Sequence, residues 1–229
     1  MKPRASFVIP AFNAERWISK TIWSCRNQTI KQIEIIVVND GSTDGTADII
    51  NWHAQEDKRV IPVHLEANVG RSGARNTGND RASSDLLLVL DSDDMACRDR
   101  VKHTLAAIHL KKADLVYGSF FAVDSMGNVE RMIRCEQFDP ARAKREKVNG
   151  ICHSTVAYTK KLATDVRYDT GDFSRLGLDD WKFQWDAHNK GYVFANVRPP
   201  LSYYRLTEDG VSATRNPDEV AKAKELVLG

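Results

Sequence analysis

The chain has 229 residues, of which 42% are hydrophobic and 28% are charged, and its formal net charge is +2. This balance is typical of a folded globular protein and argues against a disordered, collagen-like or coiled-coil chain. So small a net charge gives no indication of a nucleic-acid partner. The four cysteines are far apart and form no C-x-x-C pair, so we expect reduced thiols rather than a zinc site.

No apolar segment approaches the about 20 residues needed to cross a bilayer. Residues 1–5 lead directly into a predicted strand, without the apolar core of a signal peptide. We therefore expect a cytoplasmic protein, and any work at a membrane would require peripheral association at its inner face. The sequence does not indicate an oligomeric state.

Apolar runs alternate with helical patterns through the first half of the chain. The predicted strands are residues 6–9, 34–38, 60–65, 86–90 and 115–118, and the predicted helices are 14–28, 45–55, 74–81 and 98–111. Asn13 is the expected N-cap of the first helix, and residues 68–73 are expected to form a loop. Because strands that alternate with helices pair in parallel, this half predicts an α/β fold with a mostly parallel sheet flanked by helices.

The second half has a different pattern, which predicts a smaller mixed or antiparallel region. We expect a hairpin at 119–133, a charged helix at 139–148, a strand at 151–159, a loop at 165–178, a helix at 179–190, strands at 192–197 and 201–204, and an amphipathic helix from 216. No linker separates the halves. We therefore predict one domain over 1–229, with halves at about 1–118 and 119–215 and a helical tail at 216–229.

Three carboxylates follow the most apolar strand of the chain. The run 86–90 stops at Asp91, Ser92, Asp93 and Asp94, where a parallel strand would leave the sheet. Ligand crevices of open α/β sheets lie at that end. Crowded carboxylates repel one another unless they share a cation, and Mg²⁺ and Mn²⁺ prefer oxygen ligands together with substrate phosphates. The alternative role of these acids is to cap the following helix.

Two further features of the first half could contact a nucleotide. Asp40 ends the second predicted strand, where a carboxylate can accept hydrogen bonds from a base or ribose, although an Asx-turn would also explain it. The segment 68–76 brings small residues, including Gly70, together with Arg75, whose charge suits a phosphate. It matches neither the dinucleotide nor the P-loop fingerprint, and an ordinary helix-capping loop would have a similar composition.

Two adjacent acids begin an aromatic-rich helix in the second half. Asp179 and Asp180 precede Trp181, and neighbouring carboxylates raise one another's pKa, which produces a usable general base. The alternative is that both acids only interact favourably with the positive end of the helix dipole.

Taken together and in order, these segments resemble the family 2 glycosyltransferases of the GT-A fold. The opening strand ends in Pro10, Ala11, Phe12 and Asn13, like the family's "P-x-(aromatic)-N". Residues 37–44 match "V-(N/D)-D-G-S-x-D", 68–76 match "N-x-G-x-x-x-A-R-N", and 90–94 match "L-D-x-D-D". Asp179 and Asp180 resemble the family's "E-D" helix start, with Asp in place of Glu. The match covers nearly the whole chain.

The resemblance implies a role for each motif. The half at 1–118 would bind a nucleotide-diphosphate sugar, most often a UDP-sugar, and 119–215 would face a saccharide or lipid-linked saccharide acceptor. Asp93 would ligate Mn²⁺ or Mg²⁺, and Asp180 would be the base of a transfer with inversion. The donor-side residues would be Pro10, Ala11, Phe12, Asn13, Asp40, Asn68, Gly70, Arg75, Asp91 and Ser92, with Asp179 and Trp181 on the acceptor side. The product class would be a polysaccharide or a glycolipid.

One departure from the family pattern concerns the last core strand. Relatives often carry a histidine shortly after its Tyr-Arg pair, whereas here Arg205 is followed by Leu206, Thr207 and Glu208. Arg205 or Glu208 would have to compensate. This departure leaves open a non-catalytic nucleotide-sugar-binding or scaffold protein. A sugar nucleotidyltransferase is less favoured, because it would open with a basic Gly-rich loop, and an aspartyl-phosphate phosphatase would place its acids on an earlier strand.

Overall fold

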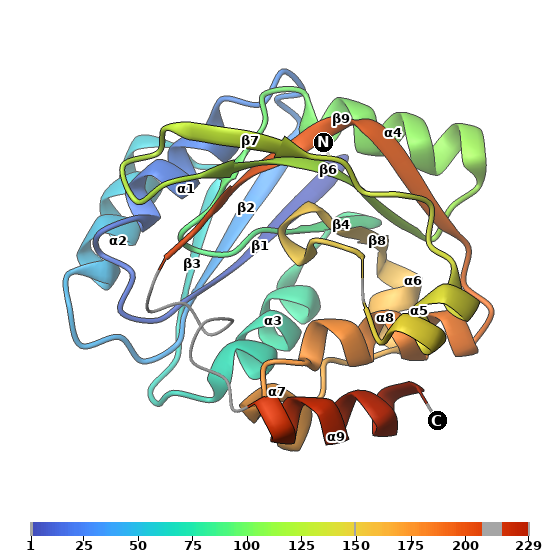
Figure 1. Ribbon diagram of the computed structural model, residues 1–229. Helices are drawn as coiled ribbons and strands as arrows, with labels where there is room; N and C mark the ends of the chain where they lie inside the picture. The colour runs from blue at the N-terminus through green and yellow to red at the C-terminus, as the bar shows by residue number, and fades with distance from the viewer. Residues whose placement is uncertain (1, 149, 208–216, 229) are drawn as a thin grey trace.

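The computed structural model describes residues 2–148, 150–207 and 217–228, and nine strands within them form one sheet (Figure 1). The order along the sheet is β3-β2-β1-β4-β8-β6-β9-β5, and β7 pairs with β6 outside that path. The strands are β1 (Ala5–Ala11), β2 (Ile33–Asn39), β3 (Val60–His64), β4 (Leu86–Val89), β5 (Met95–Ala96), β6 (Leu115–Val123), β7 (Val129–Ile133), β8 (Ala157–Thr159) and β9 (Phe194–Arg205). The predicted α/β fold with a mostly parallel sheet is confirmed.

Helices cover both faces of this sheet. They are α1 (Ile18–Arg26), α2 (Thr46–Glu56), α3 (Gly70–Arg81), α4 (Arg100–Lys111), α5 (Pro140–Glu146), α6 (Lys160–Asp165), α7 (Asp172–Arg175), α8 (Asp179–Asn189) and α9 (Pro217–Leu228), with a 3₁₀ turn, η1, at His153–Thr155. Successive strand residues point to opposite faces. Phe7 and Ile9 therefore pack with α1, α2 and α4, whereas Val8 packs with α3, α6 and α8. None of the described helices is long and apolar enough to cross a bilayer.

The second half of the chain completes the sheet. β8 pairs antiparallel with both β4 and β6. It therefore lies between these two strands, which are not neighbours in the sheet. The predicted boundary at residue 118 falls inside β6, which pairs in parallel with β9. Strands from both predicted halves thus belong to one continuous sheet.

Several predicted boundaries were wrong for local reasons. The segments 192–197 and 201–204 belong to one strand, β9, which pairs with β6 towards both of its ends. The pairing shifts register between Gly118 and Phe120 and so accommodates the irregular stretch between the two segments. The prolines of β9 lie in that irregularity, where no ladder hydrogen bond is required of them. The predicted loop 165–178 contains the short helix α7, and α9 begins at Pro217. Asn216 and Gly229, the ends of the predicted tail, lie outside the described residues.

The start of the first helix also differs from the prediction. Asn13 has φ +46° and is not the N-cap, since α1 begins only at Ile18 after a turn over 14–17. The Asn13 side chain instead accepts a hydrogen bond of 2.9 Å from the backbone N–H of Thr43. Asn13 therefore fastens the loop after β1 to the loop after β2.

The small-residue helix begins four residues earlier than predicted. α3 starts at Gly70 and packs closely on the sheet, because a Cβ at Gly78 would lie 2.5 Å from Val8 Cγ1. Only glycine permits this approach. Because the helix includes residue 71, Arg71 and Arg75, which are four positions apart, lie on the same helical face.

Candidate active site

A cavity of about 2110 Å³ opens at the carboxyl ends of β1, β2 and β4. Its wall includes every residue that the sequence analysis places at the site except Trp181. These lining residues are Pro10, Ala11, Phe12, Asn13, Asp40, Asn68, Gly70, Arg75, Asp91, Ser92, Asp93, Asp179 and Asp180. The parallel topology explains this gathering, since the strands that precede the first three motifs end at the same edge of the sheet.

Asp40 is held rigidly at the end of β2. It is 2% exposed, and its Oδ1 accepts a hydrogen bond of 2.7 Å from the backbone N–H of Val69. Asn68 donates from its amide to the Asp40 carbonyl at 3.1 Å. Gly41, with φ +69°, permits the close approach, because a Cβ there would lie 2.8 Å from the Asn68 nitrogen. The loops after β2 and β3 therefore form one preorganised corner of the cavity.

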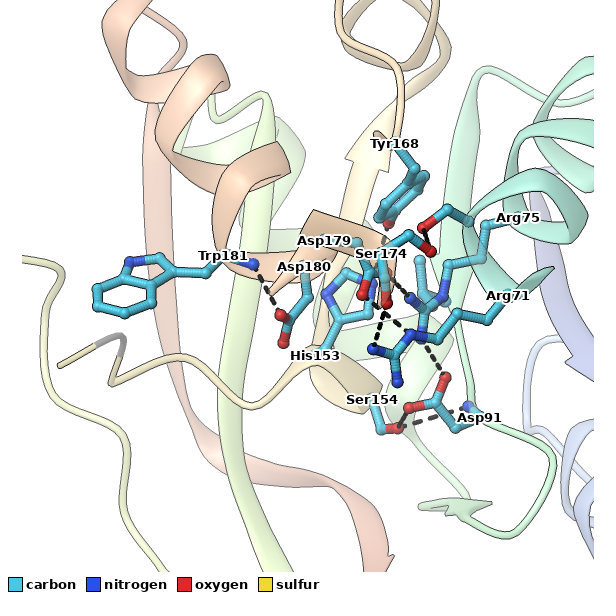
Figure 2. Close-up of polar contacts among 12 residues, drawn as sticks. Arg71, Arg75, Asp91, His153, Ser154, Tyr168, Ser174, Asp179, Asp180 and Trp181 are labelled. Carbon is cyan, nitrogen blue, oxygen red and sulfur yellow. Dashed lines mark hydrogen bonds and ion pairs between the residues drawn. The ribbon is translucent and has the colours of Figure 1, made fainter. Parts of the chain in front are cut away.

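Arginines of α3 join the donor side of the cavity to the start of α8 (Figure 2). Arg75 is 4% exposed and donates from Nη1 to Asp179 Oδ2 at 2.5 Å and from Nη2 to Asp91 Oδ1 at 2.7 Å. Arg71 donates from Nε to Asp179 Oδ1 at 2.9 Å. Asp91 also accepts a hydrogen bond of 3.2 Å from the hydroxyl of Ser154. We call Arg71, Asp179, Arg75 and Asp91 the charge chain.

The charge chain fixes the ionisation of its members. Burial alone would raise the pKa of Asp91, but the charge of Arg75 outweighs it and lowers that pKa to about 2. Burial likewise disfavours the Arg75 cation, yet Asp91 and Asp179 keep its pKa above the usual range. Asp91 is therefore a carboxylate at neutral pH, and the charge of Arg75 compensates its negative charge.

Asp93 and Asp94 lack such matching. Burial and the nearby charge of Asp91 raise the pKa of Asp93 to about 6. Asp94 is 1% exposed, and burial together with Asp93 and Asp91 raises its pKa well above the usual range. Its Oδ1 accepts a hydrogen bond of 2.7 Å from the backbone N–H of Arg205, so Asp94 ties this loop to the end of β9.

The residues at Asp93 fit a divalent cation. Burial, and then the charge of Asp91, disfavour the ionised form of Asp93, and a bound cation would relieve both effects. The described part of the chain contains no cluster of three or more His, Cys, Asp or Glu side chains that could hold a metal ion. Mg²⁺ and Mn²⁺ often take one or two carboxylates and complete their shell with phosphate and water.

Asp180 lies on the far side of the charge chain, at the first turn of α8. Burial, and then the charge of Asp179, raise its pKa to about 6. Its Oδ1 accepts a hydrogen bond of 2.8 Å from the backbone N–H of Trp181. Because Asp179 is engaged by both arginines while Asp180 faces the cavity, the two adjacent acids have different environments.

Trp181, which the sequence analysis places on the acceptor side, does not line the cavity. Figure 2 shows its indole turned away from the charge chain. The residue is 2% exposed and packs in an apolar cluster with Trp185 and with Ala223 of α9. A residue one position after a cavity-facing acid points elsewhere on a helix, so Trp181 packs α8 against α9. Asp179, with both oxygens accepting from arginines, holds the start of α8 to α3.

Sequence reasoning missed a buried polar pair beneath the charge chain. Tyr168 Oη lies 3.0 Å from His153 Nε2, and the Arg75 guanidinium lies 5.4 Å from the centre of the Tyr168 ring. Burial lowers the pKa of His153 well below its usual range, so its ring is neutral. No local signal marks either residue, because their importance arises from contacts with distant parts of the chain. The four-residue spacing of Arg71 and Arg75 would have been a signal, had the helix been predicted from residue 70.

Arg205 is the arginine of the Tyr-Arg pair after which relatives often carry a histidine. Its Nε donates to the Asp93 carbonyl at 2.9 Å, and its Nη1 donates to the carbonyls of Asp124 and Ser125 at 2.9 and 3.0 Å. Thr207 lines the cavity, whereas Glu208 lies outside the described residues. Arg205 therefore braces the Asp93 loop against the β6–β7 hairpin.

The curled, mostly parallel sheet flanked by helices matches the GT-A class of glycosyltransferase folds. S. aureus TarS residues 1–349 in complex with UDP-GlcNAc has a TM-score of 0.78 at 20% identity, covering 99% of this chain and 66% of that chain. A Pyrobaculum calidifontis mannosyltransferase, PcManGT, in complex with GDP-Man and Mn²⁺, has a TM-score of 0.70 at 16% identity, covering 93% of this chain and 60% of that one.

The sequence comparison specifies the family. The model described as glycosyl transferase family 2 matches residues 6–167. The Bacillus subtilis protein EpsH, named as a glycosyltransferase, is 40% identical over 217 residues, which are 89% of this chain and 61% of EpsH. A Haemophilus influenzae glycosyltransferase is 34% identical over 131 residues, and the match spans 57% of this chain and 52% of that protein. The chain therefore belongs to glycosyl transferase family 2, and it spans about half the length of several relatives that it matches.

Proposed function

We propose that this protein transfers a sugar from a nucleoside diphosphate donor, a UDP-sugar, to an acceptor hydroxyl with inversion at the anomeric carbon. The observation that carries the proposal is the pairing of two acids of raised pKa, Asp93 and Asp180, in one cavity across a fixed charge chain. Asp93 would hold the cation that stabilises the leaving group, and Asp180 would accept the proton of the incoming hydroxyl. Family membership and the UDP-GlcNAc complex of TarS support the same reading.

Asp180 is the proposed general base. With a pKa of about 6, it is a carboxylate at neutral pH and a better proton acceptor than an ordinary aspartate. It would take the proton of the acceptor hydroxyl as that oxygen bonds to the anomeric carbon and the bond to the diphosphate oxygen breaks. A single displacement of this kind inverts the anomeric centre, as the geometric logic of glycoside hydrolysis also requires.

The donor side would be organised by Asp40, Asp91 and Asp93. Asp40, on its rigid corner, would accept hydrogen bonds from the base or ribose, with Pro10, Ala11, Phe12, Asn68 and Gly70 beside it. Asp93, with Ser92 and Asp91 close by, would hold Mn²⁺ or Mg²⁺, which when bound neutralises charge on the diphosphate leaving group. Arg75 would set the position of Asp91 from beneath.

The acceptor would occupy the part of the cavity beyond Asp180. That part is lined by polar and charged side chains of the second half, including Glu130, Arg134, Glu136 and Arg142. Such a wall offers donors and acceptors for the hydroxyls of a saccharide or a lipid-linked saccharide. We propose polysaccharide or glycolipid synthesis as the setting, with peripheral association at a membrane where the acceptor carries a lipid.

Calorimetric titration of UDP, with GDP as the comparison nucleotide, tests the donor assignment in the presence and absence of Mn²⁺. We expect UDP to bind in a metal-dependent way, and wild-type protein to transfer sugar from at least one UDP-sugar. Asp180→Asn should bind UDP normally and transfer no sugar. A protein that binds UDP but transfers nothing in a screen of donors and acceptors would instead be the non-catalytic binding module considered above.

A further inference from the structure

A tryptophan lies between two arginines at the rim of the cavity. Cζ of Arg16 and Cζ of Arg205 each lie 4.2 Å from the centre of the Trp17 ring. A guanidinium at that distance is within range of a cation–π interaction, so both cations interact with the same indole. All three residues line the cavity that contains Asp93. We call Arg16, Trp17 and Arg205 the cation stack.

The cation stack adjoins the Asp93 loop. Arg205 links the two, because its Nε donates to the Asp93 carbonyl at 2.9 Å while its guanidinium covers the Trp17 ring. The same side chain donates to two carbonyls of the hairpin turn, so Arg205 is committed to protein partners. Its position is therefore fixed, and it in turn fixes the indole.

Arg16 differs from Arg205 in its partners within the described part of the chain. Its side chain is exposed, and among the described residues it forms no ion pair with a carboxylate. Two positive charges on one indole repel each other, and this repulsion is relieved when an anion binds beside them. An arginine held flat against an aromatic ring also loses less freedom when it forms bidentate hydrogen bonds to phosphate.

We propose that Arg16 binds the diphosphate of the nucleotide donor, with Trp17 and Arg205 as the residues that position it; this proposal rests on the proposed function. As the bond between the anomeric carbon and the diphosphate oxygen breaks, the electron pair stays with that oxygen, and Arg16 stabilises the charge with two N–H groups. The cation stack thereby supplies a positive group beside the Asp93 loop.

The test compares ligands with and without phosphates in one variant. Uridine, UMP and UDP are titrated calorimetrically, in saturating Mn²⁺, into wild type, Arg16→Gln, Arg16→Lys and Lys20→Gln. Lys20 is an exposed cation on α1 outside the cavity wall, so its substitution removes one positive charge only four positions from Arg16. We expect Arg16→Gln to weaken UDP binding about tenfold and to leave uridine binding unchanged. Arg16→Lys should give a smaller loss, and Lys20→Gln should match wild type.

The possible results separate the two levels of the proposal. Equal UDP affinity in wild type and Arg16→Gln, or an equal loss for uridine and UDP, would overturn the assignment of Arg16 while leaving the glycosyltransferase reading intact. Wild-type protein that binds neither UDP nor GDP would overturn the proposed function and this inference with it. A loss confined to phosphate-bearing ligands, and reduced at high ionic strength, would establish it.

Discussion

The Nη1 atom of Arg75 lies 2.5 Å from Oδ2 of Asp179, although 104 positions of sequence separate the two residues. This ion pair is nearly fully buried, and it connects α3 to α8, the helix that carries Asp180. Asp91, which follows β4, and Asp179, which begins α8, are therefore joined through one guanidinium.

Substitution of Arg75 by Gln should destabilise the protein strongly. It leaves the buried Asp179 and the partly buried Asp91 with one cationic partner fewer, and removing one member of a buried pair typically costs about 3–5 kcal/mol. Arg71→Gln is the matched control, because Arg71 is 28% exposed and contacts only Asp179 among these acids. Urea unfolding should show a clearly larger loss for Arg75→Gln, and similar losses would contradict the central position given to Arg75.

The rate of transfer should depend on the ionisation of Asp180. The base acts only when deprotonated, and its pKa is raised to about 6, so the rate should rise with pH through about 6 and level off above it. The check is kcat measured between pH 5 and 9 at saturating donor. An acid limb centred near 4 would mean that Asp180 is not the titrating group.

Asp180→Asn should stabilise the fold at high pH. A carboxyl whose pKa is higher in the folded state is penalised once charged, so the penalty is complete above about pH 6 and fades as the pH falls towards 4. Removing the charge should increase the free energy of unfolding by roughly 1–3 kcal/mol at pH 8. By pH 4 only a small remainder of this gain is expected. Denaturant titrations of both proteins at the two pH values measure the difference, and a gain that is independent of pH would argue against the raised pKa.

Asp93→Asn should abolish the metal dependence of UDP binding. The substitution keeps the size of the side chain and removes the charge that would hold Mn²⁺. Asp172→Asn is a suitable control, since Asp172 is an 80% exposed aspartate on α7. Titration of UDP with and without Mn²⁺ should show enhancement in wild type and in the control only.

Gly41→Ala should disturb the corner of the cavity that the loops after β2 and β3 form. The residue has φ +69°, and a Cβ would lie 2.8 Å from the Asn68 backbone nitrogen, so both strain and a clash with the backbone are expected. Gly191→Ala is the control, because Gly191 has φ +80° and nothing within 4 Å of the added carbon. It should cost only the roughly 1–2 kcal/mol of a left-handed alanine. Thermal unfolding and UDP affinity should both be affected more at position 41.

The sequence by itself determined the elements and motifs that depend on local pattern. Short apolar runs and their alternation with helices predicted the parallel strands β1, β2, β3 and β4, because hydrophobic periodicity is a local property. The topological rule for parallel strands then predicted that Asp40 and Asp91 would face one crevice, since both follow such strands. Both aspartates line the cavity, together with eleven other site residues expected from the sequence.

Only the tertiary structure decided which partner each side chain has. The insertion of β8 between β4 and β6, the burial of Trp181 beneath α9 and the engagement of Asp179 by two arginines all join segments that are distant in the sequence. Nothing local distinguishes Asp179 from Asp180, yet one is neutralised by arginine and the other faces the cavity with its pKa raised. Charge, burial and pKa are set by what surrounds a group in space, and that surrounding exists only once the chain has folded.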